Sequence, residues 1–145
     1  MSIYDLNDIE ARVVKINKDN GWSDDMPEGG PELTHWLITK LALGITELSE
    51  GIEEVRKGHA PGATYYSYPP VPASLAVEFS SGQEAQEHWE STQAGKPEGL
   101  PSELADTVIR IVHLCALLKI DLPAIIDEKL TYNASRGFRH GNKAA

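Results

Sequence analysis

The sequence has a single cysteine, few basic residues and no long hydrophobic run, and each absence excludes a class of protein. Cys115 stands alone among 145 residues, so no disulfide can form within the chain and an oxidising compartment is not implied. The chain carries 13 Lys and Arg against 22 Asp and Glu, a net charge of −9 that would repel nucleic acid and anionic lipid. Its apolar runs fall far short of the about 20 residues that a membrane span needs. We therefore expect no nucleic-acid polymer and no membrane as partners.

The length and the first residues are typical of a soluble protein with one domain. A chain of 145 residues lies within the about 100–200 residues of a typical domain. The opening MSIYDLNDIEARVVKIN alternates acidic and hydrophobic positions and lacks the apolar centre of a signal peptide. We therefore predict a single domain over residues 1–145 and a cytoplasmic location.

Hydrophobic residues recur at spacings of three and four in four segments, which predicts an all-α fold. The predicted helices cover residues 3–18, 31–57, 101–118 and 122–135. Pro31 and Asp121 are typical of helix starts, and Gly58 is typical of a residue that follows a helix end. Short connections would make the four helices resemble a four-helix bundle.

One long connection, residues 58–100, interrupts this bundle-like plan between the second and third helices. The segment is rich in Pro, Gly, Ser and Tyr and shows no sustained period, apart from a short predicted helix over 82–91. A loop of this length in a compact domain usually has a function, so we interpret it as an inserted loop or lid. The basic tail at 138–145 is expected to be mobile.

The third predicted helix is apolar over most of its circumference. Leu104, Val108, Ile111 and Cys115 follow one face, and Ile109 extends the apolar surface beyond it. A helix of this kind is buried on several sides, which a chain of this length does not easily achieve alone. We therefore predict self-association as a homodimer or a homotetramer.

Acidic residues are spaced to share helix faces in two of the predicted helices. Glu47, Glu50 and Glu54 lie three and four residues apart on the second helix, and Glu103 and Asp106 lie three apart on the third. These carboxylates can simply be solvated faces of amphipathic helices. If instead they face one another, they form an all-oxygen site that suits Mg²⁺, with Mn²⁺ as a substitute.

In order along the chain, E-x-x-E, E-x-x-D and K-x-x-x-N resemble the MazG-like group of all-α nucleoside triphosphate pyrophosphohydrolases. The similar segments are PELTHWLITKLALGITELSEGIEEVRKG, GLPSELADTVIRIVHL and IDEKLTYNASRGFRHG, together with INKDNGW near the start. They cover about residues 5–57 and 97–143, which is most of the chain apart from the middle loop. The resemblance implies a MazG-type fold and cleavage of a nucleoside triphosphate, ribo- or deoxyribo-, into a monophosphate and pyrophosphate.

The resemblance also implies roles for particular residues. Glu47, Glu50, Glu103 and Asp106 match the acids that bind Mg²⁺, and Glu47 or Glu50 is the candidate for the base that deprotonates the attacking water. The residues expected to contact the phosphates, the sugar or the base are Lys129, Asn133, Trp22, Arg110 and Arg136.

One position departs from the family pattern, and two alternatives to the predicted reaction stay open. Many members carry a further acidic pair one turn earlier, where this chain has Leu43 and Gly44, so Glu54 is the candidate for a further metal ligand. One alternative is an enzyme of the same chemistry, dUTPase-like or acting on phosphoribosyl-ATP. The other is a non-catalytic helical module for oligomerisation or interaction. A role in cleaning the nucleotide pool would suit the predicted enzyme.

Overall fold

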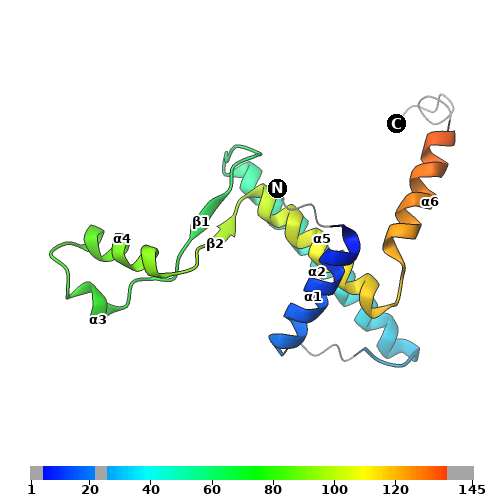
Figure 1. Cartoon of the computed structure of the whole chain (residues 1–145), viewed down its shortest axis with the longest axis horizontal. Coiled ribbons are helices and arrows are strands. Elements are labelled where there is room, and N and C mark those ends of the chain that lie inside the picture. The colour runs from blue at the N-terminus through cyan, green and yellow to red at the C-terminus, as the bar shows by residue number, and fades with distance from the viewer. Residues whose placement is uncertain (1–4, 22–25, 137–145) are drawn as a thin grey trace. The chain divides into compact units, whose positions relative to one another are not determined.

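A computed structural model describes residues 5–21 and 26–136, and these are mainly helical, as predicted (Figure 1). The elements, in chain order, are α1 (Leu6–Asp19), α2 (Gly30–Arg56), β1 (Tyr65–Ser67), α3 (Ala73–Ala76), α4 (Gly82–Thr92), β2 (Lys96–Glu98), α5 (Leu100–Leu117) and α6 (Leu122–Ser135). None of the helices in these two ranges is long and apolar enough to cross a membrane. The tail at 138–145 and the first residues of the helix predicted from residue 3 lie outside the described residues.

Local signals in the sequence account for where several helices begin and end. Asp5 caps α1 by accepting a hydrogen bond from the backbone N–H of Asp8, whose side chain accepts in return from the Asp5 N–H. Asp121 caps α6 in the same way, through the N–H of Ala124 at 3.1 Å. Gly58 follows the end of α2 with a φ of 82°, which glycine adopts without steric cost.

The chain divides into two compact units, and the first comprises Met1–Ile45 and Thr107–Ala145. Within it α1 contacts α6. Its buried apolar residues among those described are Val13, Val112 and Cys115, and burial raises the pKa of the Cys115 thiol. This unit therefore contains a small core formed by the N-terminal and C-terminal parts of the chain.

The second unit, Thr46–Asp106, contains the inserted loop predicted over 58–100, and this segment also holds short elements that the sequence did not predict. β1 and β2 pair antiparallel, with Tyr65 opposite Glu98 and Ser67 opposite Lys96, and α3 packs on α4. The short helix predicted over 82–91 is confirmed as α4. Strands of three residues are too short to show an alternating pattern, and their partners are about thirty residues apart, so the sequence carries no local signal for them.

Two residues make specific backbone contacts within the inserted segment: Gly99 at the end of β2 and Trp89 on α4. Gly99 has a φ of 101°, and a Cβ added there would lie 2.5 Å from the carbonyl oxygen of Ala63. Only glycine therefore permits β2 to turn directly into α5 beside the start of the insertion. Further along, the Trp89 indole N–H on α4 donates a hydrogen bond to the carbonyl oxygen of Pro69 at 2.8 Å.

Candidate functional site

Three glutamates of the second unit form an acidic cluster. Glu47 and Glu50 of α2 and Glu103 of α5 place carboxylate oxygens within 4.8 Å of one another. Glu47 is 6% exposed and Glu103 is 5% exposed, whereas Glu50 is exposed to solvent. The structure thus brings together three of the four acids that the sequence predicts as principal metal ligands.

Gly51 permits the close approach of the two helices that carry this cluster. A Cβ at this position would lie 3.1 Å from Cδ1 of Leu100 and 3.5 Å from Cβ of Glu103. The first of these contacts is tighter than ordinary van der Waals packing, so a larger residue at position 51 would require the Leu100 side chain to shift by a few tenths of an ångström. Gly51 is therefore a point of close contact between α2 and the first turn of α5.

The electrostatics of the cluster favour a cation. Burial raises the pKa of the Glu103 carboxyl above its usual range, and the nearby charges of Glu50, Asp106 and Glu47 raise it further. Asp106 is half-buried one turn further along α5, so it acts on Glu103 although it lies outside the group of three. A bound cation would remove this repulsion between like charges, which suits an all-oxygen site for Mg²⁺.

In α2 acidic residues are buried and the apolar stripe is exposed, which is the reverse of an ordinary amphipathic helix. Glu47, Gly51 and Glu54 are buried, at spacings of four and three residues. The apolar stripe is exposed, and it consists of Leu41, Ile45, Leu48, Ile52 and Val55. Buried carboxylates are costly unless they are compensated, so the interpretation of these acids as a solvated face fails for Glu47, Glu54 and Glu103.

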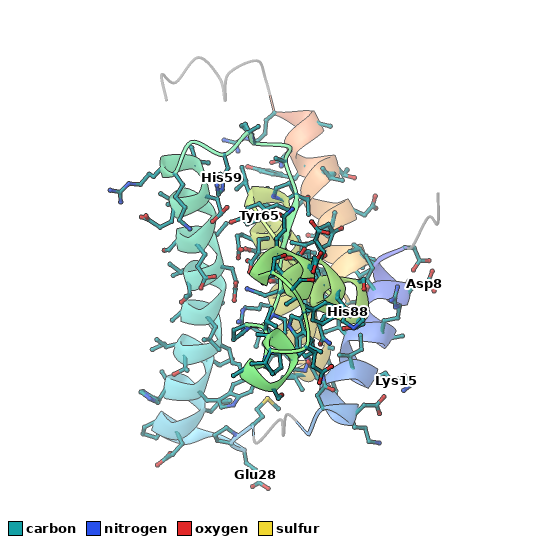
Figure 2. All side chains as sticks on the ribbon, turned by 90° about the vertical axis from the view of Figure 1, so that its left-hand side faces the viewer. Asp8, Lys15, Glu28, His59, Tyr65 and His88 are labelled. Atoms are coloured by element: carbon teal, nitrogen blue, oxygen red, sulfur yellow. The ribbon has the colours of Figure 1, made fainter. Side chains whose placement is uncertain are left out.

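Glu54 belongs to a separate hydrogen-bonded network at the end of α2. Its Oε1 accepts from Lys57 Nζ at 3.0 Å, and its Oε2 lies 2.6 Å from His59 Nδ1 and 2.9 Å from the Tyr65 hydroxyl. His59 and Tyr65 lie side by side (Figure 2). Their ring centroids are 4.9 Å apart in an edge-on arrangement. These donors, led by His59 and Lys57, lower the pKa of Glu54 to about 2. Glu54 thus ties β1 to α2 and lies outside the acidic cluster.

We expect Glu54→Gln to lower the melting temperature by several degrees at pH 7, by an amount that shrinks in acid. The pKa of Glu54 is lower in the folded protein than its ordinary value of 4.5, so ionised Glu54 stabilises the folded protein at pH values above 4.5. This contribution is lost as the pH falls toward about 2. Thermal melts of both proteins from pH 7 to pH 2 measure the difference. Glu53→Gln is the matched control, because that carboxylate is exposed and pairs with Arg56. Equal melting temperatures for Glu54→Gln and the wild type at pH 7 would contradict the role of this network.

A cavity of about 540 Å³ adjoins the acidic cluster. It lies within the second unit, and it shares Glu50 and Glu103 with the cluster. Its remaining lining residues are Thr46, Ser49, Glu53, Glu54, Lys57, Tyr65, Ser67 and Glu98. The volume lies within the range of about 300–1,000 Å³ found for small-molecule sites. Sequence reasoning missed the part that β1 and β2 contribute, since it interpreted residues 58–100 only as an inserted loop or lid.

The other predicted site residues lie in the first unit or outside the described residues. Lys129, Asn133 and Arg136 are exposed on α6 or directly after it, with Lys129 Nζ 5.4 Å above the ring of Tyr132. Arg110 is half-buried on α5, and Trp22 lies outside the described residues. The roles of these residues stay predictions.

Comparison with protein-family models, with curated proteins and with solved structures finds no match for this chain.

Proposed function

We propose that this protein is a Mg²⁺-dependent nucleotide pyrophosphohydrolase of the MazG-like type, which cleaves a nucleoside triphosphate to a monophosphate and pyrophosphate. The observation that carries the proposal is the burial of Glu47 and Glu103 against Glu50 while the apolar face of the same helix is exposed. Carboxylate oxygens that gather in this way offer a divalent cation several oxygen ligands at once. The reaction itself is inferred from the resemblance of the sequence motifs to MazG-like pyrophosphohydrolases.

The carboxylates fit Mg²⁺ on the chemistry of their donors. Glu47, Glu50 and Glu103 offer only oxygens, gathered within 4.8 Å, which is the ligand type that hard divalent cations prefer. Glu103 and Asp106 match the second acidic pair of the resemblance. When bound, Mg²⁺ would neutralise phosphate charge and lower the pKa of a coordinated water, and Mn²⁺ is the expected substitute.

Glu50 is the residue that we assign as general base. It is exposed and lines the cavity, whereas Glu47 is buried and lines an apolar groove beside Leu48 and Ile52. The Glu50 carboxylate would take the proton of the water whose oxygen attacks the α-phosphorus. The bond from that phosphorus to the bridging oxygen breaks, and pyrophosphate leaves with the bridging oxygen. The structure thus favours one of the two bases that the sequence leaves open.

Self-association is a second part of the proposal. The exposed stripe of α2 follows the seven-residue spacing by which helices pair, and a second copy of the chain is the occupant that supplies a matching stripe. The homodimer and the homotetramer both satisfy this requirement. The same exposed stripe is what a non-catalytic interaction module would also present, so the metal-dependent reaction is what separates the two functions.

The first test is pyrophosphate release from canonical and modified nucleoside triphosphates, with Mg²⁺ and with EDTA. We expect release of pyrophosphate, not orthophosphate, that depends on the metal and differs among bases. Phosphoribosyl-ATP and dUTP in the same panel separate the two sister activities. No release from any substrate, with a protein that melts cooperatively, would contradict the proposed function and favour the interaction module.

A further inference from the structure

The cavity beside the acidic cluster has a second wall, and that wall is contributed by the insertion. β1 supplies Tyr65 and Ser67, and β2 supplies Glu98. None of these residues belongs to the acidic cluster, and none lies in the segments that carry the family resemblance except Glu98. The wall therefore adds to the cavity polar side chains that are separate from the acidic cluster.

Glu98 is held with its carboxylate oriented. The Ser67 hydroxyl donates to Oε1 of Glu98 at 2.8 Å across the strand pair, and Lys96 Nζ donates to Oε2 at 3.1 Å. The Glu98 side chain is 19% exposed, whereas Lys96 is 68% exposed. The hydrogen bond from Ser67, together with that from Lys96, lowers the pKa of Glu98, so the carboxylate is ionised at neutral pH.

Glu98 retains acceptor capacity, and more of it than the neighbouring Glu54. A carboxylate can accept about four hydrogen bonds, and the structure gives Glu98 two donors. Glu54 accepts from three donors already. The group that meets Glu98 in this cavity must therefore be a hydrogen-bond donor.

Resting on the proposed function, we propose that Glu98 is a specificity-determining residue that accepts hydrogen bonds from a donor group of the substrate's nucleoside. The donor that we propose is either an exocyclic amino group of the base or the 2′-hydroxyl of ribose. With the triphosphate held through a cation at Glu50 and Glu103, the nucleoside would occupy the remainder of the cavity. Ser67 then acts as a positioning residue, since it orients the Glu98 carboxylate without being required to contact the substrate.

The experiment compares kcat/KM for pyrophosphate release from ATP, GTP, ITP and dGTP in the wild type, Glu98→Gln and Ser67→Ala. ITP lacks the exocyclic amino group of ATP and GTP, and dGTP lacks the 2′-hydroxyl. Glu98→Gln preserves the shape and one carbonyl acceptor but removes the charge. We expect the wild-type preference for the donor-bearing substrate to fall by about 10-fold or more in Glu98→Gln and by a smaller factor in Ser67→Ala.

Each outcome has one meaning. A fall in the preference for ATP or GTP over ITP assigns the donor to the base, and a fall in the preference for GTP over dGTP assigns it to the sugar. Unchanged preferences in an active Glu98→Gln would overturn the inference alone, whereas silence of the wild type on every substrate would overturn the proposed function as well. Glu87→Gln is the matched control, because it removes one charge from the exposed surface of α4. Thermal melts show that each variant is folded.

Discussion

Replacing Glu103 by Gln together with Asp106 by Asn is expected to lower Mg²⁺-dependent pyrophosphate release by about 100-fold or more. The two substitutions keep the size of the side chains but remove two charges from the acidic cluster and its neighbourhood. The same variant is expected to melt, without metal, at an equal or higher temperature than the wild type. This second expectation follows because the folded-state pKa of Glu103 is raised, so its charge destabilises the folded protein at pH 7.

Two measurements on that variant separate a metal site from a structural role. Steady-state rates give the loss of activity, and melting curves with added Mg²⁺ report binding without any turnover. A ligand that binds the folded state alone raises the melting temperature, so the Mg²⁺-dependent rise should be present in the wild type and absent in the variant. The control carries Glu87→Gln with Glu90→Gln on α4, which removes two acids elsewhere in the same unit. Turnover at the wild-type rate in the Glu103 and Asp106 variant would contradict the site.

Substituting Ile52 by Lys is expected to convert an oligomer into single chains. Ile52 is 60% exposed in the middle of the apolar stripe of α2, beside Leu48 and Val55. A specific interface usually buries about 800 Å² on each partner and excludes charge from its centre, so one lysine there would be buried without a partner. Light scattering after size-exclusion chromatography should give at least twice the mass of one chain for the wild type, and the mass of one chain for the variant.

The control for this prediction is Val77→Lys. Val77 follows α3 in the insertion and is 82% exposed. Its substitution therefore also replaces an exposed apolar side chain by lysine, but outside the stripe. This control should keep the mass of the wild type. A wild-type protein that runs as a single chain at every concentration would contradict self-association, whether or not the Ile52→Lys variant folds.

Helical segments of this protein are predictable from the sequence because their signals are local. The stripe from Leu41 to Val55, the cap at Asp121 and the glycine at position 58 act over one or two turns, and the structure has α2 and α6 where these signals predict them. The short α4 also lies where the sequence predicts a helix over 82–91, and the structure shows Ser81 as its N-terminal cap. The strands β1 and β2 have no local signal in the sequence, because each is stabilised by pairing with a strand about thirty residues away.

The candidate site divides in the same manner. The spacing of Glu47 and Glu50 determines that both lie on one side of α2, and the first turn of α5 is where the sequence predicts Glu103. Spacing alone cannot say which neighbours a carboxylate meets. Glu54 continues the acidic stripe in the sequence. In the structure, however, its carboxylate is bound by Lys57, His59 and Tyr65 at the end of α2 and lies outside the cluster.

The helical class, the net negative charge and the order of acidic pairs on which the proposed reaction rests all follow from the sequence alone. Three other features become known only from the folded chain. Glu47 and Glu54 of α2 are buried while its apolar stripe is exposed, Gly51 lies in close contact with the first turn of α5, and the insertion places Ser67 and Glu98 in the wall of the cavity. The physical reason is how far apart in the sequence the interacting residues lie. Helix faces depend on residues three and four apart, whereas burial, pKa and cavity walls depend on contacts between segments that are distant in the sequence.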